Sequence, residues 1–300
     1  GHARFDVRNS RFGVRGSVSE NMSYRTQVEF SSEGKLSVLD AYVAYRLPAV
    51  SVSLGQQQYA FSTDLARSPM QNIFANRTFV AKYAATYADT SGKVSAFGSR
   101  DIGGLLTVTL RRWIPVVLKA GLFNGSGANN PAWQERLNVS VKAEYGGDDG
   151  LQAAASYYSG QMPQTQRLAM WGGELRYITP KLILDAEVAQ RTYEQNGRHT
   201  LTAAYLQGLY KIDLKPNLLA QYLAPTLRYD AVRNGSYSSA VGQFDAQRAS
   251  VGVNVGVSRK LIKGEIRFGF EKYIISRKPS NFHIDELLHD KATVEMVVTF

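Results

Sequence analysis

Basic side chains recur at alternating positions along this chain, and their chemistry is the most informative feature of the sequence. Arg11 and Arg15, for example, alternate with Phe12, Val14 and Gly16, so the two bases share one face of an extended segment. A guanidinium group fits two oxygens of one phosphate or carboxylate, so arginines in a row beside water can bind small anions. The candidate anion-contacting residues are Arg11, Arg15, Arg25, Arg46, Arg67, Arg100, Arg111, Lys119 and Arg136.

Acidic residues stand on the same polar faces and leave two interpretations open. The chain carries 35 Lys and Arg against 25 Asp and Glu, which gives a formal charge of +10 at pH 7. Rings of Arg and Lys on the wall of a pore favour anions. Alternatively, many of these charges pair with each other across neighbouring strands and only stabilise the sheet. Arg136 with Glu144 and Glu174 with Arg176 are candidate structural pairs.

Alternation of apolar and polar residues marks about fifteen segments, and it indicates strands with one oily and one polar face. The segments are about 9 to 14 residues long, which exceeds the five or six residues usual in soluble sheets. A tilted strand needs 9 to 11 residues to cross the hydrocarbon of a membrane. The predicted strands are 10–19, 23–32, 36–47, 50–60, 100–111, 115–123, 135–146, 151–159, 167–178, 182–192, 199–211, 217–230, 246–258, 263–275 and 290–300.

The connections between these segments alternate in length. Short turns lie at 112–114, 147–150, 179–181, 213–217 and 258–262, whereas longer polar loops lie at 61–99, 124–134, 160–166, 193–198, 231–245 and 276–289. Long loops on one side and short turns on the other are typical of bacterial outer-membrane barrels. A soluble β-sandwich also alternates, but it has no reason to sort its loops in this way.

Residue types on the oily face and at the strand ends favour the membrane barrel over the sandwich. Aromatic residues such as Tyr45, Tyr145 and Tyr210 stand near predicted strand ends, as an interfacial girdle requires. The last segment ends on Phe300, in the manner of the assembly signal of outer-membrane barrels. No stretch of 18 apolar residues is present for a membrane helix, and the lack of cysteine excludes disulfides.

The first 125 residues resemble the phosphate-selective porin O/P family of bacterial outer-membrane porins. The resemblance rests on Phe5–Gly16, Ser23–Ser31, Leu39–Tyr45 with Leu54–Gln56, Arg100–Gly103 and Ala120–Gly125. It implies a sixteen-stranded, trimeric barrel that passes anions and whose first strand precedes residue 1. The sequence departs from the family pattern in three places. Gln58 and Ala60 stand where a basic residue and a proline are expected, and Arg8 alone replaces the paired arginines before Arg11.

The long segment 61–99 is the candidate for a loop that folds into the barrel and narrows it. Ser62 to Arg67 reads as a capped helical turn that Pro69 interrupts. Loops of this length are uncommon unless they serve a function. We expect Arg11, Arg25, Arg67 and Arg100 to line the narrowest region, and Arg77, Lys82 and Lys93 add charge to the loop. The alternative is a lid that packs over the mouth of the barrel.

Other classes of function find little support in the residues. His283 and His289 lie near Asp285 and Glu286, but their spacing fits no standard metal motif. The chain contains no Gly-x-Ser-x-Gly nucleophile motif, no P-loop and no nucleic-acid-binding signature.

We therefore predict a single domain, 1–300, that forms a transmembrane antiparallel β-barrel in the bacterial outer membrane. It passes small hydrophilic solutes by passive diffusion, with a bias to anions such as phosphate. We expect no enzymatic activity, no cofactor and no nucleic-acid partner. The expected partners are outer-membrane lipid, lipopolysaccharide, small anions and further copies in a homotrimer. The alternatives are a plugged, structural barrel in a larger assembly and an outer-membrane hydrolase.

Overall fold

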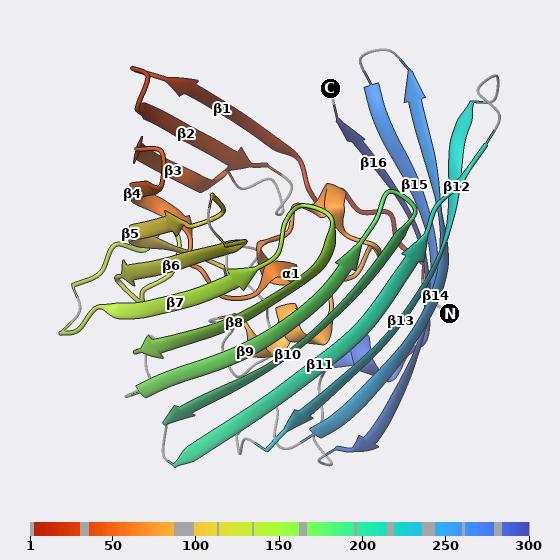
Figure 1. Cartoon of the computed structure of the whole chain (residues 1–300). Coiled ribbons are helices and arrows are strands. Elements are labelled where there is room, and N and C mark those ends of the chain that lie inside the picture. Colours follow the sequence, from red (N-terminus) through yellow and green to blue (C-terminus); the bar gives the residue numbers. More distant parts are fainter. Residues whose placement is uncertain are drawn as a thin grey trace.

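One antiparallel sheet of sixteen strands curves around a segment that we call the inner loop, residues 61–86 (Figure 1). The computed structural model describes residues 3–30, 36–86, 99–112, 114–133, 135–161, 167–194, 197–214, 219–235, 244–259, 262–278 and 284–299. The strands are β1 Arg11–Ser17, β2 Met22–Glu29, β3 Ser37–Arg46, β4 Val50–Gln58, β5 Arg100–Thr109, β6 Val116–Phe123, β7 Asn138–Tyr145, β8 Gly150–Gly160, β9 Arg167–Ile178, β10 Leu182–Glu194, β11 Arg198–Tyr210, β12 Ile212–Asp213, β13 Ala220–Asn234, β14 Phe244–Arg259, β15 Ile262–Arg277 and β16 Lys291–Thr299.

Each long strand pairs with its neighbours in sequence, so the sheet is a simple meander. All the predicted strand segments are strands in the structure, with ends that differ by a few residues. The additional strand is β12, whose Ile212 and Asp213 pair with Leu223 and Tyr222 of β13 just beyond the end of β11. Within the described residues, β1 and β16 are the two edges of the sheet, and Arg8 and Glu295 approach to 4.0 Å between them.

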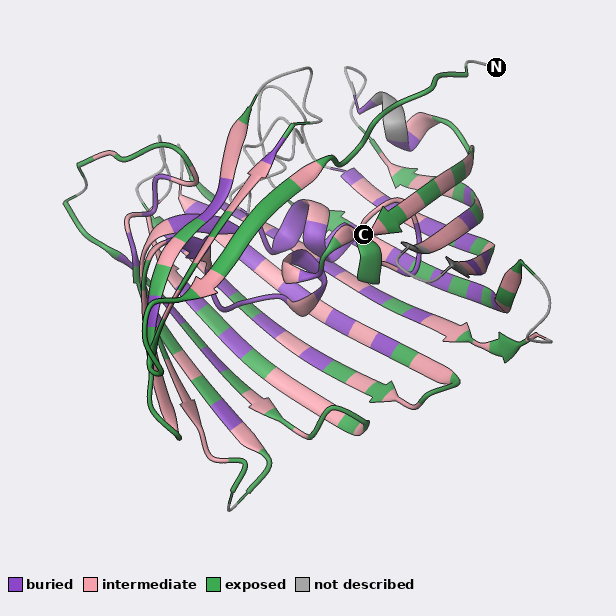
Figure 2. Cartoon of the chain, turned by 90° about the horizontal axis from the view of Figure 1, so that it is seen from above, coloured by how far each residue is buried: buried purple, intermediate pink, exposed green. Residues whose placement is uncertain are grey.

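Exposure along the strands is the reverse of what a water-soluble sheet shows. On the outside, Leu206, Leu227 and Val251 are 59%, 65% and 52% exposed, whereas the inward-facing Asp230 and Arg248 are 0% and 2% exposed. Figure 2 shows this alternation along the strands. An apolar outer face and a charged inner face fit lipid outside and polar groups inside. The soluble β-sandwich is therefore wrong for this chain, because that fold keeps its apolar face inside.

The inner face is not polar throughout, and here the sequence-based expectation of a polar lumen wall needs correction. Leu168, Met170, Leu201, Val232 and Phe244 of the long strands point inward and are buried. They pack against the inner loop that follows β4, so the alternation there places apolar residues on both faces of the wall. Burial against another protein segment, rather than contact with water, is the physical reason.

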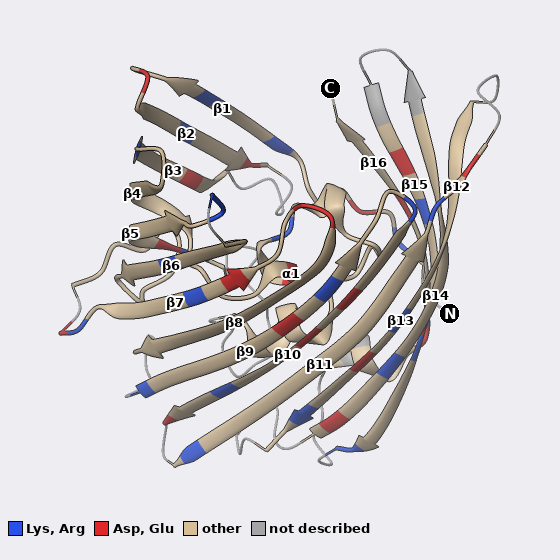
Figure 3. Ribbon diagram, in the orientation of Figure 1, with Lys and Arg blue, Asp and Glu red and all other residues tan. Residues whose placement is uncertain are grey.

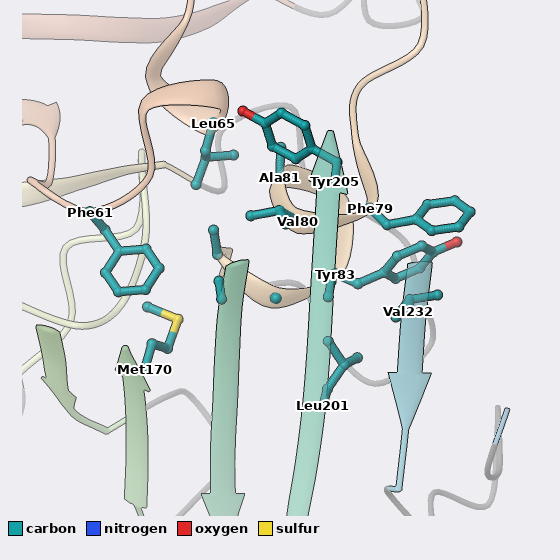
Figure 4. Close-up of a cluster of buried hydrophobic side chains, with 14 of the residues drawn as sticks. Phe61, Leu65, Phe79, Val80, Ala81, Tyr83, Met170, Leu201, Tyr205 and Val232 are labelled. Atoms are coloured by element: carbon teal, nitrogen blue, oxygen red, sulfur yellow. The ribbon is translucent and has the colours of Figure 1, made fainter. Parts of the chain in front are cut away.

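The inner loop carries three short helical turns, namely α1 (Thr63–Ala66), η1 (Pro69–Gln71) and η2 (Val80–Ala84). Phe61, Leu65, Phe79, Val80 and Tyr83 of this loop form a buried cluster with the apolar residues of the wall (Figure 4). A further turn, α2 (Asp285–Leu288), adds Leu287 to the same cluster. None of the helices in the described residues is long and apolar enough to cross a membrane.

The wall consists of two halves of different height. Strands β1–β8, which we call the short wall, contain 7 to 11 residues each. Strands β9–β11 and β13–β15, the tall wall, contain 12 to 16 residues each. At a rise of about 3.4 Å per residue, the tall wall extends well beyond the short wall. The inner loop packs mainly against the tall wall, with η2 in contact with β10 and β11.

Candidate functional site

Charged residues on the inner face of the tall wall form compact ion-paired clusters. Arg228 lies 2.6 Å from Glu271 and 2.8 Å from Asp230, and Arg248 lies 2.9 Å from Asp230. All four side chains are at most 3% exposed. Figure 3 shows basic and acidic residues on neighbouring strands in this part of the wall. Two cations and two anions leave the cluster neutral, so it presents little net charge to a solute.

This neutral cluster also holds the inner loop in place. The backbone N–H of Phe79 donates to Asp230 at 2.9 Å, and Arg248 donates to the carbonyl oxygen of Arg77 at 2.8 Å. Arg228 donates to the carbonyl oxygen of Asn76 at 2.7 Å. Charged side chains of the wall therefore satisfy backbone groups of a loop that would otherwise be buried without partners.

The start of α1 is fixed to the wall in a similar way. The Ser62 hydroxyl caps the helix by accepting from the N–H of Leu65, and the Thr63 N–H donates to Glu174 at 3.0 Å. Lys142 donates to the same oxygen of Glu174 at 2.7 Å and to the Thr63 hydroxyl at 2.8 Å. Carboxylates are favourable beside the free N–H groups at the beginning of a helix.

Three of the candidate arginines lie in close ion pairs. Arg100 is 6% exposed and contacts Asp40 at 2.8 Å, and Arg11 contacts Glu29 at 2.7 Å. Arg67 bonds to Asp64 at 3.0 Å and also to Asp185. Burial opposes the charge of Arg67, but the two carboxylates outweigh it and raise the pKa of Arg67 above its ordinary value.

The remaining candidates are more exposed and lie at different levels. Arg15, Arg46, Arg111 and Arg136 are exposed, and the Lys119 side chain is 29% exposed, 2.8 Å from Glu144. Arg111, in the turn between β5 and β6, pairs with Asp148 in the turn between β7 and β8, and Arg136 precedes β7 on the side of the long loops. The structure therefore spreads these candidates from one mouth of the barrel to the other rather than gathering them at one point.

Two cross-strand pairs on the short wall place like charges directly opposite each other. Arg15 faces Arg25 in the pairing of β1 with β2, and Lys119 faces Lys142 in the pairing of β6 with β7. Arg25 reaches Asp40 at 3.2 Å, but within the described residues Arg15 has no ion pair. Like charges directly opposite on one face of a sheet are unfavourable unless something else stabilises them.

The inner loop brings further cations to a cavity of about 250 Å³ beside β14–β16. Arg8, Arg77, Lys82 and Lys291 line it, together with the paired Arg248 and one carboxylate, that of Glu295. Arg77 donates to the carbonyl oxygens of Asp64, Leu65 and Arg67 and so caps the end of α1. Sequence reasoning placed Arg77 and Lys82 on the loop without selecting them. Only the folded path of the loop reveals that both line a cavity.

Lys82 has an unusual environment. Burial, and then the neighbouring charges of Lys291 and Arg248, lower the pKa of Lys82 to about 7, although Glu271 acts in the opposite direction. The ammonium group also lies 5.3 Å from the centre of the Tyr83 ring. The charge of this cavity therefore changes near neutral pH.

A second cavity, of about 530 Å³, lies on the other side of η1 near the short turns. Arg67, Arg176, Lys181 and Lys211 line it, with Glu265 as a carboxylate. Asn72 lines both cavities, so the two adjoin at η1.

Metal binding finds no support in the part of the chain that the structure describes, since no three His, Asp or Glu residues there are placed to hold an ion. His283, the predicted loop base Lys93 and the terminal Phe300 lie outside the described residues.

Comparisons with known proteins agree with this architecture. Residues 1–142 match the family model described as phosphate-selective porin O and P. OmpF of Salmonella typhi, solved with daunomycin, aligns with a TM-score of 0.68 and 14% identity, and the alignment covers 99% of this chain and 92% of the OmpF chain. The anion-selective porin of Comamonas acidovorans has a TM-score of 0.62 and 12% identity, with coverage of 96% and 86%. OmpT of Vibrio cholerae in its trimer form has a TM-score of 0.58 and 11% identity, with coverage of 97% and 89%. No curated protein sequence matches the chain.

Proposed function

We propose that small anions, phosphate among them, diffuse passively along the basic inner wall of this chain, a porin of the bacterial outer membrane whose residues 1–142 match the phosphate-selective porin O and P family. The observation that carries this proposal is the opposition of Arg15 and Arg25. The Arg25 side chain is 42% exposed, and Arg15 is exposed without an ion pair in the described residues. An anion between the two guanidinium groups would relieve their repulsion.

We assign different roles to the candidate basic residues. Arg15, Arg25, Arg46 and Lys119 are the proposed solute contacts on the short wall, and Arg111 and Arg136 attract anions at the two mouths. The loop cations Arg77 and Lys82 act with them. Arg11, Arg67 and Arg100 mainly hold the fold, because each has a close carboxylate and a side chain that is only 18%, 5% and 7% exposed. Arg25, Arg111 and Lys119 also have carboxylate partners, but their side chains are more exposed.

We also propose that the inner loop, residues 61–86, forms the constriction of one barrel domain. The two cavities on either side of η1 support this, since they meet at Asn72 beside the loop. A solute that passes between them would meet Arg77 and Lys82 on one side of η1 and Arg176 and Lys211 on the other. A cation on both sides of the narrow point favours anions over cations.

Trimerisation through the short wall is the arrangement that the outer surface supports. Phe12, Leu122 and Leu137 keep this surface apolar up to the side of the long loops, with exposures of 64%, 53% and 53%. A subunit interface tolerates such a surface, whereas lipid headgroups at that level do not. Outer-membrane lipid and lipopolysaccharide then surround the tall wall of each copy.

Reversal potentials in planar bilayers under a salt gradient test the anion preference. In the variant Arg15→Gln/Arg25→Gln we expect the anion-to-cation permeability ratio to fall several-fold. The matched control is Arg167→Gln/Arg233→Gln, which removes the same charge from the outer face and should leave the ratio unchanged. Equal ratios in the wild type and the Arg15/Arg25 variant would refute the assignment. Block of the chloride current by added phosphate tests whether phosphate is among the solutes.

A plugged barrel remains the second candidate function, because the inner loop is packed into the wall by a large apolar cluster. Liposome swelling separates the two. Swelling in small sugars or in sodium phosphate supports a diffusion channel, and its absence for the wild type supports the plugged barrel.

A further inference from the structure

The outer face of the tall wall carries an ordered series of side chains from one membrane boundary to the other. On β9 the series runs from Tyr177 near the short turns, through Leu175, to Trp171 and then Arg167 near the long loops. Ten residues separate Tyr177 from Arg167. At about 3.4 Å per residue and a tilt of about 40°, they span about 25 Å of height, which is the thickness of the apolar band of such barrels.

Two further strands repeat this order on the same face. On β11, Tyr210 and Leu206 lead to Arg198, and on β13, Leu227 and Tyr229 lead to Arg233. The lower-left ends of β9 and β11 are accordingly basic in Figure 3. Each arginine therefore stands just beyond the apolar band, at the level where lipid headgroups begin.

The three arginines have no bonding partner in the part of the chain that the structure describes. Arg167, Arg198 and Arg233 are exposed, and within the described residues none of them makes a hydrogen bond or ion pair. Glu194 stands opposite both Arg167 and Arg198 in the strand register, but it lies beyond ion-pair distance of each. Asp245, which stands opposite Arg233, bonds instead to Arg277 at 3.1 Å.

We propose that Arg167, Arg198 and Arg233 bind the phosphate groups of an anionic glycolipid of the outer leaflet, of the lipid A type, on the tall wall. The proposal rests on the outer-membrane location and is independent of what the lumen conducts. Guanidinium groups fit phosphate oxygens in pairs, and the outward aromatic and aliphatic residues below them supply the surface for acyl chains. Trp171 and Gln190 are hydrogen-bonded on this surface at 3.0 Å, which fixes the indole ring just below the arginines.

The same row does not suit a second protein subunit as well. A subunit interface tends to exclude charged groups from its centre, and three exposed arginines on the tall wall would have to find carboxylates on the partner. The outer face of the short wall is apolar up to the side of the long loops, and it lacks such a row of arginines among its described residues.

The experiment measures binding of lipid A to the purified porin in neutral detergent at low salt. The wild type is titrated with diphosphorylated lipid A and with the same lipid A after removal of both phosphates. Because each basic residue near an anionic surface contributes about fivefold to binding, the variant Arg167→Gln/Arg198→Gln/Arg233→Gln should bind the phosphorylated lipid on the order of 100-fold more weakly. The dephosphorylated lipid should bind the wild type and this variant equally.

A matched control removes three exposed cations from the opposite end of the barrel, namely Arg111→Gln/Arg112→Gln/Lys181→Gln, and it should bind lipid A as the wild type does. Equal affinity of the wild type and the Arg167→Gln/Arg198→Gln/Arg233→Gln variant for phosphorylated lipid A overturns the proposal. Inorganic phosphate alone that displaces the lipid at millimolar concentration also overturns it, because the site would then be one for free phosphate. If the Arg167→Gln/Arg198→Gln/Arg233→Gln substitutions change only the oligomeric state, the three arginines serve contacts between copies and the proposal is overturned.

Failure of this proposal is distinguishable from failure of the porin function. The Arg167→Gln/Arg198→Gln/Arg233→Gln variant should retain the reversal potential of the wild type. The Arg15→Gln/Arg25→Gln variant should bind lipid A with the affinity of the wild type.

Discussion

The two halves of the wall use the same residue types in opposite ways. The tall wall has buried, neutralised charges inside and, outside, arginines without a partner among the described residues. The short wall has exposed basic residues inside and an apolar surface outside. Arg248 and Arg15 illustrate this, since both point inward, yet Arg248 touches Asp230 and loop backbone while Arg15 touches no carboxylate in the described residues. A wall arginine serves the fold where a close carboxylate or the backbone of the inner loop neutralises or binds it, as for Arg100 and Arg248. An inward arginine without such a partner in the described residues, such as Arg15, is the kind that we propose for contact with solute.

Removal of one carboxylate from the neutral cluster of the tall wall should have the largest effect on the stability of the protein. Asp230→Asn leaves Arg228 and Arg248 buried with one carboxylate, that of Glu271, and it weakens the contact to the N–H of Phe79. Loss of one partner from a buried ion pair costs about 3 to 5 kcal/mol. We expect the free energy of unfolding in detergent to fall by this amount, as measured by guanidinium titration of tryptophan fluorescence. A loss below about 1 kcal/mol would show that the cluster does not hold the loop.

The second prediction sharpens the division between structural and solute-facing arginines. Arg100→Gln removes the buried partner of Asp40 and should cost about 2 to 3 kcal/mol of stability, while the anion preference stays near that of the wild type. Arg15→Gln should do the reverse, with stability within about 0.5 kcal/mol and a lower anion preference. Thermal unfolding and reversal potentials on the two variants check this. The division fails if both variants lose selectivity equally.

The third prediction concerns the pH dependence of the loop cavity. Lys82 has a pKa of about 7, against 10.5 ordinarily, so it is charged below pH 7 and loses its charge above it. Anion preference should therefore decrease by about twofold between pH 6 and pH 8. The folded state binds fewer protons than the unfolded state between pH 7 and pH 10.5, so this group makes stability rise with pH across that window.

Reversal potentials of the wild type and Lys82→Met at pH 6, 7 and 8 provide the measurement. The variant keeps the histidines, so any titration that persists in it belongs to other groups. An unchanged pH profile in Lys82→Met would assign the effect elsewhere.

Removal of an exposed carboxylate should change stability least, and it is the counterpart of the Asp230→Asn substitution. Asp148→Asn removes the partner of Arg111 at a short turn, where the two side chains are 92% and 46% exposed. Exposed ion pairs contribute little, so stability should change by less than about 0.5 kcal/mol. A larger loss in the same guanidinium titration would show that this turn matters for the fold.

Much of the architecture could be predicted because it depends on local alternation. The Arg167–Ile178 strand was predicted to the residue, and the long loop after β4 was identified from its length. The short strand β12 escaped prediction because two residues carry no periodic pattern. The inward apolar residues such as Met170 also escaped, since alternation shows that two faces differ but not what covers each.

Among the candidate solute contacts, sequence reasoning could find which residues face inward but not which were already neutralised. Arg67 and Asp185 are 118 positions apart, and Arg100 and Asp40 are 60 apart, so nothing in the local pattern reveals either pair. Arg77 and Lys82 lay in a segment without periodicity, and only its path beside β14–β16 shows that they line a cavity.

Local alternation of residue types is enough to specify long amphipathic strands with basic polar faces, because neighbouring side chains of a strand point to opposite faces. Which of those basic residues remain available to an anion depends on the folded chain. That outcome depends on contacts between distant segments, since a carboxylate from another strand or a carbonyl of the inner loop can satisfy a guanidinium group.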